Sequence, residues 1–206
     1  MSLSKLKKED YESLIQYFPF LYPRNVWTDK PVEDYAYGWC LGVDELPDGW
    51  KRLFLLYCKH MREELLLYKY LDKFRFTQIK EKYGEMRLYN NGAPRDSKCH
   101  DLEYIYGHLS TYVCQDCGKP AKYESEGWIA QECEEHKTQD SVKKGNRSYY
   151  VTLISCDANG KQTKRKIDCK GYWYEYIKCL ELTDENFLHY VKTGEFIKTK
   201  KVEKHK

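Results

Sequence analysis

Three cysteines and one histidine form two closely spaced pairs in the middle of this 206-residue chain. Cys114 pairs with Cys117 and Cys133 with His136, which gives the pattern Cys-x2-Cys-x15-Cys-x2-His. A tetrahedral zinc ion takes such ligands from two separate turns of the chain, two thiolates from one and a thiolate with an imidazole from the other. Gly118 follows the first pair and permits the left-handed turn that wraps backbone around a metal. The pattern predicts a zinc site.

A Cys3His set fills all four positions of a tetrahedral ion and leaves none for a reactive water molecule. Glu132, Glu134 and Glu135 stand beside the ligands and could be taken for a general base. Solvated carboxylates that flank a zinc turn are the simpler interpretation. The segment between the pairs is too polar to bury much apolar surface, and zinc contributes on the order of 10 kcal/mol to the folding of small zinc modules. We therefore expect structural Zn²⁺ and no catalytic residue.

Other patterns that could support catalysis are weak. The stretch HMREE at residues 60–64 resembles half of a metalloprotease signature, but it lacks the second histidine one helical turn later. His100 and His108 could exchange with a zinc ligand, although surface histidines are the simpler interpretation. The chain has no glycine-rich phosphate loop and no nucleophile motif. A metal-dependent enzyme, or a protein that sequesters a nucleotide signal in an aromatic pocket, therefore ranks behind a binding function.

The composition is that of a folded protein: 41% of the residues are hydrophobic and 33% are charged. No run approaches the roughly 20 apolar residues that a membrane span requires. The N-terminal segment has acids where a signal peptide has its apolar stretch. We expect a cytoplasmic protein. In that reducing compartment the remaining cysteines are expected as small buried hydrophobes.

Around the zinc pairs, the spacing of apolar residues predicts an α+β fold. Residues 1–37 form an N-terminal helix and an irregular arm. Residues 38–137 form a helix, hairpin and zinc-knuckle domain. Its first helix begins near Asp48, its β-hairpin turns at Gly84, and a second helix leads to Cys114.

The remainder of the chain is predicted as a second, small antiparallel module with a short C-terminal helix. A polar stretch with the composition of an exposed linker precedes it, and Thr183 can cap the helix. The predicted segments are a linker at 138–148, a β-meander plus helix at 149–197 with strands near 149–156, 161–169 and 172–182, and a basic mobile tail at 198–206.

Basic residues are concentrated in this last third of the chain. Residues 1–136 hold 19 Lys and Arg against 23 Asp and Glu, whereas residues 137–206 hold 16 against 9. Cations interleaved with strand tyrosines can contact the phosphates and bases of single-stranded nucleic acid. An exposed, solvated hairpin face explains the same pattern. The candidate nucleic-acid ligands are Lys161, Lys164, Arg165, Lys166 and Lys170.

Several motifs occur together in a fixed order. They are DGW at 48–50, KEKYGEMRLY at 80–89, CQDCG at 114–118, GW at 127–128 and CEEH at 133–136. This order resembles a family of uncharacterised phage and prophage proteins that read DGW, KEKFGGLRFY, CxxCG, GW and CxxH. The resemblance covers about residues 38–137. Glu85 stands where that family has a second glycine, and the basic segment after residue 148 lies outside the pattern.

The resemblance implies zinc and a phage origin, and it brings no activity with it. For a phage-encoded chain, the expected cytoplasm is that of the host cell. We therefore expect a non-catalytic, zinc-stabilised binding protein that inhibits a host defence or replication factor. Its partner is expected to be a host protein or protein complex, with nucleic acid as the alternative. Tyrosine and tryptophan are enriched at the energetic centres of interfaces, which makes Tyr35, Tyr37 and Trp39 candidate anchors. A packed core would explain these aromatic residues equally well.

Overall fold

The computed structural model describes most of the chain, with side chains from residue 12 onward. The described residues are 8–22, 24–25, 28, 30–31, 46–156 and 159–197. The candidate anchors Tyr35, Tyr37 and Trp39 and the basic tail 198–206 lie outside the described residues.

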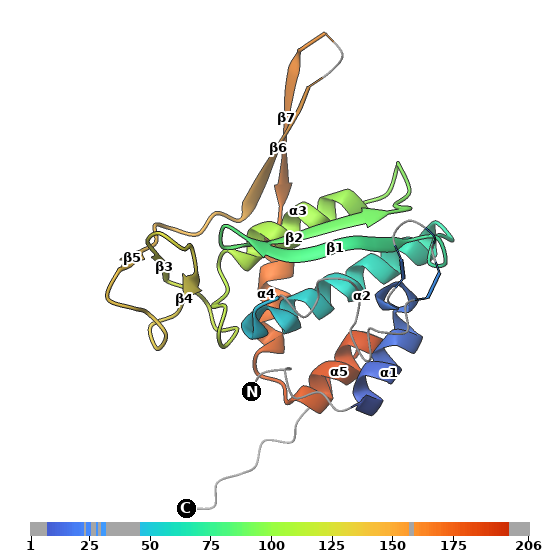
Figure 1. Ribbon diagram of the computed structural model, residues 1–206, viewed down its shortest axis with the longest axis horizontal. Coiled ribbons are helices and arrows are strands. Elements are labelled where there is room, and N and C mark those ends of the chain that lie inside the picture. The colour runs from blue at the N-terminus through green and yellow to red at the C-terminus, as the bar shows by residue number, and fades with distance from the viewer. Residues whose placement is uncertain are drawn as a thin grey trace, which may run out of the picture.

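Helices and antiparallel strands are both present, which confirms the α+β class (Figure 1). The helices are α1 (Lys8–Tyr17), the 3-10 turns η2 (Pro19–Leu21) and η4 (Asp48–Trp50), α2 (Lys51–Leu67), α3 (Cys99–Ser110), α4 (Lys170–Cys179) and α5 (Asp184–Thr193). The strands are β1 (Arg75–Lys82), β2 (Glu85–Asn91), β3 (Tyr123–Ser125), β4 (Gln131–Glu132), β5 (Ser141–Lys143), β6 (Tyr150–Cys156) and β7 (Gln162–Asp168).

Helix α2 is the centre of the core, as its apolar spacing predicts. Leu53, Tyr57, Met61 and Leu65 repeat at intervals of four residues and are fully buried. Asp48 does not cap the helix; its carboxylate instead accepts a hydrogen bond from the Lys51 ammonium at 2.5 Å. The buried residues of α2 pack in one cluster with residues from every other helix.

The β1–β2 hairpin turns at Gly84, as predicted, and lies against α3. The Met86 amide donates to the Ser110 hydroxyl at 2.8 Å, and that hydroxyl donates to the Gly107 carbonyl at 2.6 Å. A Cβ at Gly107 would stand 3.0 Å from the Glu85 carboxylate and 3.1 Å from the Met86 carbonyl, so a glycine lets helix and strand approach closely.

The predicted third strand at 172–182 is wrong, because this segment belongs to helix α4. Its aromatic residues suggest a strand by propensity, yet Trp173, Tyr176 and Cys179 recur every three residues and are buried on one helical face. Burial of that face in the common core outweighs strand propensity. Helix α5 follows as predicted, with the Thr183 hydroxyl accepting from the Asn186 amide and Gly194 in the left-handed region at its end.

The C-terminal segment is therefore not a separate β module, since α4 and α5 share the core of α2. The two-stranded β6–β7 hairpin projects from the body of the molecule (Figure 1). The predicted linker 138–148 also differs from expectation: it contains β5, which pairs with β3 in a sheet of order β4-β3-β5. Backbone pairing stabilises this polar segment where apolar burial does not.

No described helix combines the length and the apolar character that a membrane span needs.

Candidate metal centre

The four predicted zinc ligands meet at one point. One ligand atom from each of Cys114, Cys117, Cys133 and His136 lies within 4.8 Å of all the others. Cys117 Sγ is 3.7 Å from Cys133 Sγ, and His136 Nδ1 is 3.6 Å from Cys114 Sγ and 3.3 Å from Cys133 Sγ.

These separations fit a tetrahedral zinc ion. Metal–ligand distances of about 2.3 Å for sulfur and about 2.0 Å for nitrogen give tetrahedral edges of about 3.8 Å between two sulfurs and about 3.5 Å between sulfur and nitrogen. Cys114 and Cys133 are buried, Cys117 is half-buried and His136 is exposed. The donor set and its geometry match what a structural zinc site requires.

The first pair of ligands sits on a tight backbone turn. The Gly118 amide donates to the Cys114 carbonyl at 3.0 Å, and the Cys114 amide donates to the Lys119 carbonyl at 2.8 Å. Gly118 has φ +78°, a left-handed conformation that side chains rarely adopt. The short β3–β4 hairpin then brings Cys133 and His136 back to this turn.

The DGW motif holds the first turn in place. The Gly49 amide donates to the Gln115 carbonyl at 2.7 Å, and the buried Trp50 indole donates to the Val113 carbonyl at 2.9 Å. Gly49 has no room for a side chain, since a Cβ there would stand 2.1 Å from the Cys114 carbonyl oxygen. The motif thus ties the start of α2 directly to the metal ligands, a role that the sequence pattern did not reveal.

Helix α4 supports the same turn from the other end of the chain. The Tyr176 hydroxyl is buried and donates to the Gly118 carbonyl at 2.6 Å. Burial raises the pKa of this phenol far above its usual value, so the hydroxyl remains a donor. The turn is therefore clamped between α2 and α4, which lie more than a hundred residues apart in sequence.

Ionisation of two ligand thiols is opposed by burial. Desolvation raises the pKa of Cys114 and raises that of Cys117 to about 12. At Cys133 burial also opposes ionisation, but the Glu135 amide and the His136 ring together lower the pKa below its usual value. A bound cation supplies the positive charge that holds such thiols as thiolates.

The three carboxylates beside the ligands each have a hydrogen-bond or ion-pair partner. Glu135 forms an ion pair with Lys119, and Glu134 accepts hydrogen bonds from Lys137 and Tyr123; these contacts lower the pKa of both exposed carboxyls. Glu132 accepts from the Ser141 hydroxyl. None of the three belongs to the four-ligand group found among the described residues.

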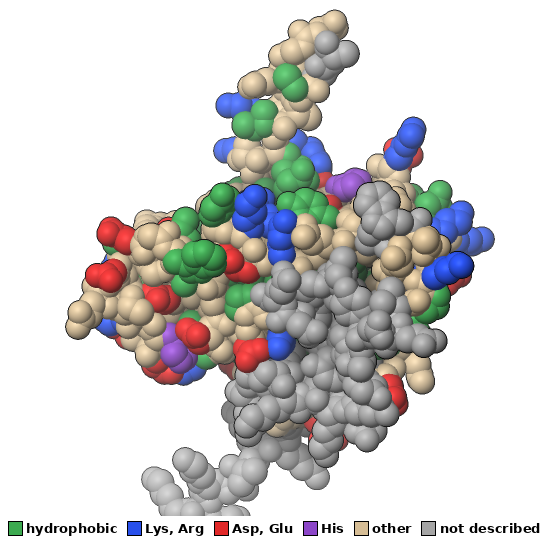
Figure 2. Space-filling model, viewed as in Figure 1, with side chains coloured by type: hydrophobic (Ala, Val, Ile, Leu, Met, Phe, Trp, Pro, Cys, Tyr) green, Lys and Arg blue, Asp and Glu red, His purple; other side chains and the backbone are tan. Residues whose placement is uncertain are grey.

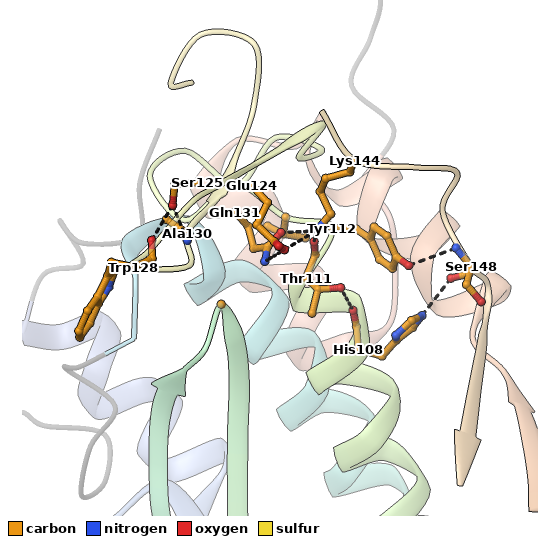
Figure 3. Close-up of polar contacts among 12 residues, drawn as sticks. His108, Thr111, Tyr112, Glu124, Ser125, Trp128, Ala130, Gln131, Lys144 and Ser148 are labelled. Carbon is orange, nitrogen blue, oxygen red and sulfur yellow. Dashed lines mark hydrogen bonds and ion pairs between the residues drawn. The ribbon is translucent and has the colours of Figure 1, made fainter. Parts of the chain in front are cut away.

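Lys144 joins the zinc region to α3 from the segment predicted as a linker (Figure 3). Its half-buried ammonium donates to the Thr111 carbonyl at 2.6 Å and to the Gln131 side chain, and it lies 3.4 Å from Glu124. Burial lowers the pKa of Lys144, and the nearby carboxylate partly offsets that effect. A lysine in a polar stretch gives no sequence signal for this role.

Three other described histidines, His60, His100 and His108, lie outside the metal group. His60 lies between the Tyr106 hydroxyl at 2.6 Å and the Glu175 carboxylate at 3.0 Å. His100 contacts Glu103, and His108 contacts the Ser148 carbonyl. Each of these three has a partner within the fold, and none of them belongs to the four-ligand group.

The basic candidates lie on or beside the projecting β6–β7 hairpin. Arg165 is already engaged, because its guanidinium forms two hydrogen bonds with the Asp101 carboxylate at 2.6 and 2.5 Å. Lys164 and Lys166 share the opposite face of the hairpin with Ile154, and all three are exposed. Lys161 lies near the tip, and Lys170 begins α4 near the ring of Tyr174.

Of the singly spaced cysteines, Cys58, Cys99, Cys169 and Cys179 are buried as predicted. The prediction is wrong for Cys156, which is exposed at the end of β6, and Cys40 lies outside the described residues.

No protein-family model matches the chain, and neither curated proteins nor solved structures gave a match.

Proposed function

We propose that this protein is a non-catalytic, zinc-stabilised binding protein, encoded by a phage or prophage, that inhibits a host defence or replication factor by covering part of its surface. The observation that supports a non-catalytic role is the closed ligand set. Three sulfurs and one nitrogen, all mutually within 4.8 Å, account for four tetrahedral positions. The motif order from 38 to 137 is what favours the phage source.

Bound zinc would supply a cross-link between the two ligand turns and so contribute to folding free energy. The chain's own residues do the positioning. Gly49 and Trp50 hold the first turn against α2, and Tyr176 holds it against α4. Such an arrangement favours a metal that shapes the surface, and it leaves recognition to exposed side chains.

Two measurements on the reduced, untagged full chain test this function. The visible spectrum of the cobalt-substituted protein should report four protein ligands, three of them thiolates. A water molecule in one of the four coordination positions would contradict a non-catalytic role. A pull-down from the native host, analysed by mass spectrometry and nucleic-acid staining, should retain a protein partner with little nucleic acid. Retention of nucleic acid alone would contradict inhibition of a protein.

A second candidate function is nucleic-acid binding, favoured by the projecting β6–β7 hairpin (Figure 2). Its outer face carries Lys164 and Lys166 beside Ile154, away from the ion pair of Arg165 with Asp101. Phosphate contacts make affinity fall steeply with salt, by a logarithmic slope of about 0.7 to 0.9 for each neutralised phosphate. Replacing Lys164 and Lys166 by alanine should lower that slope, whereas Lys178→Ala on α4 should not. Absence of any shift of labelled oligonucleotides at low salt would exclude this function.

A further inference from the structure

The β1–β2 turn is docked against the zinc unit, defined as residues 114–143. A Cβ at Gly84 would stand 2.5 Å from the Ile129 side chain and 2.6 Å from that of Gln131. This glycine is therefore in close contact with the β3–β4 connection. Two hairpin ends, one from the KEKYG motif and one from the Gly127-Trp128 pair, consequently lie side by side.

Between the two ends lies a hollow of about 230 Å³. It is lined by Glu81, Lys82, Tyr83, Gly127, Trp128 and Ile129. Tyr83 is 71% exposed and Trp128 is 83% exposed, which are the two largest exposed fractions among the described aromatic residues. The fold brings two large, unburied aromatic side chains to one small concavity.

Tyr83 occupies its position at a conformational cost. Its φ is +55°, and only Lys69 among the other described non-glycine residues has a positive φ. Asparagine or glycine is the usual choice at such a turn position, because a larger side chain clashes with its own backbone. The ring is mostly solvent-exposed, so packing does not compensate for the strain. Backbone strain of this kind is concentrated at functional sites.

Trp128 lies on a turn that is closed by side-chain hydrogen bonds. The Ser125 hydroxyl donates to the Trp128 carbonyl at 2.6 Å and accepts from the Ala130 amide at 2.8 Å. Figure 3 shows the indole extending away from this network of backbone contacts. The backbone is held while the side chain stays exposed, an arrangement that lowers the entropy lost when a partner binds.

The net charge of the zinc unit favours a cationic partner. Glu126 precedes Gly127, which lines the hollow, and its amide donates to the Asp140 carbonyl at 3.3 Å; neither carboxylate forms an ion pair within the described part of the chain. The zinc unit as a whole holds seven acids against four lysines, and three of the acids are paired: Glu124 with Lys144, Glu134 with Lys137 and Glu135 with Lys119 (Figure 2). The lysine that lines the hollow, Lys82, has its ammonium 5.2 Å from the centre of the Tyr83 ring. This acidic surface disfavours a phosphate backbone.

We infer that Tyr83 and Trp128 form a docking site for one large apolar side chain of a protein partner whose flanking residues include lysine or arginine. This site specifies how the protein partner of the proposed function would be recognised, and the inference therefore rests on the proposed function. Two aromatic faces around a small hollow fit one large apolar residue, and the acids of the zinc unit complement neighbouring cations. The metal centre contributes by holding the turn of Trp128 beside that of Tyr83.

The test uses the zinc-loaded full chain and a library of random peptides. Peptides are selected on the wild-type protein and counter-selected on the double variant Tyr83→Asn, Trp128→Ala. Asparagine is chosen because it tolerates the left-handed turn. The enriched peptides should share one large apolar residue close to lysine or arginine.

A labelled, synthetic copy of an enriched peptide then gives affinities. We expect each single variant to weaken binding by roughly tenfold or more, and replacement of the apolar peptide residue by alanine to do the same. Tyr104→Ala on α3, another exposed tyrosine, should leave the affinity unchanged. Zinc content and melting temperature confirm that each variant is folded.

Three outcomes would overturn the inference: no peptide that distinguishes the wild type from the double variant, enriched peptides without an apolar residue, or a labelled single-stranded oligonucleotide that binds with the same dependence on Tyr83 and Trp128. The host pull-down separates this failure from failure of the proposed function. A partner protein retained equally by wild type and Trp128→Ala contradicts the docking site alone, whereas no retained protein contradicts inhibition itself.

Discussion

Gly49 and Cys114 are in such close contact that a Cβ on the glycine would stand 2.1 Å from the cysteine carbonyl oxygen. The turn that carries Cys114 and Cys117 is therefore packed against the start of α2. Because backbone lies on both sides of this contact, neither partner can yield easily.

Gly49→Ala is expected to destabilise the protein by about 3 kcal/mol or more, since one added methyl must displace backbone and the Gly49–Gln115 hydrogen bond. Urea unfolding of the zinc-loaded protein measures this change. Gly145→Ala is the matched control, because a Cβ there meets nothing within 4 Å, and it should change stability by less than about 0.5 kcal/mol. Equal effects of both substitutions would contradict the contact.

Removal of a metal ligand should lower zinc content and stability together. Cys117→Ser is expected to lose stoichiometric zinc and to unfold the zinc unit, since zinc binding supplies on the order of 10 kcal/mol in small modules. Elemental analysis and the thermal unfolding curve measure the two effects. Cys156→Ser, which changes an exposed cysteine outside the ligand group, should retain the metal. A zinc-free wild-type chain with unchanged stability would contradict a structural metal.

Tyr176→Phe removes the buried hydrogen bond to the Gly118 carbonyl and leaves that oxygen without its donor. We expect a loss of about 1 to 3 kcal/mol in the free energy of unfolding. Tyr174→Phe, at a half-exposed position on the same helix, serves as the control and should be nearly neutral. A neutral Tyr176→Phe variant would show that α4 does not support the metal site.

Glu103 should make the protein less stable as pH rises. Its carboxyl is 15% exposed and one oxygen lacks a partner among the described residues. Burial raises its pKa from 4.5 to about 7, although His100 partly opposes this shift. The folded state thus binds the proton more tightly, and stability falls between pH 4.5 and about 7, by at most about 3 kcal/mol.

Glu103→Gln removes that titration. The variant should therefore gain in melting temperature relative to the wild type at pH 8 and show little difference at pH 4. The gain must develop across the interval from pH 4.5 to about 7. A constant difference between the two proteins at all pH values would contradict a buried, titrating carboxyl.

Tyr83→Asn should stabilise the free protein, by about 0.5 to 1 kcal/mol, because asparagine tolerates the φ of +55° better than tyrosine does. Chemical denaturation measures the gain. Gly84→Ala, in the next residue of the same turn, should have the opposite sign, since φ is +70° and Ile129 leaves no space. Loss of stability in Tyr83→Asn would mean that the ring packs usefully in the free protein.

Local patterns in the sequence predict the elements whose signal is local. The helical spacing of α2, the turn at Gly84, the strands near 149–156 and 161–169, and the cap at Thr183 all produced the expected element. The zinc ligands could be found for the same reason, because each pair lies on a single turn of the chain. Helix α4 could not be predicted in this way, because its aromatic residues favour a strand by local propensity. Burial of one helical face in the core decides its conformation.

The sequence by itself determined which atoms can bind a metal and indicated the positions of α2, the β1–β2 turn and the start of α5, because these depend on neighbouring residues. Only the tertiary structure decided that Gly49, Trp50 and Tyr176 support the first metal turn, that the C-terminal helices share the central core, and that Tyr83 and Trp128 border one hollow. Those relationships join segments that are distant along the chain, and close packing in three dimensions, rather than residue spacing, brings them together.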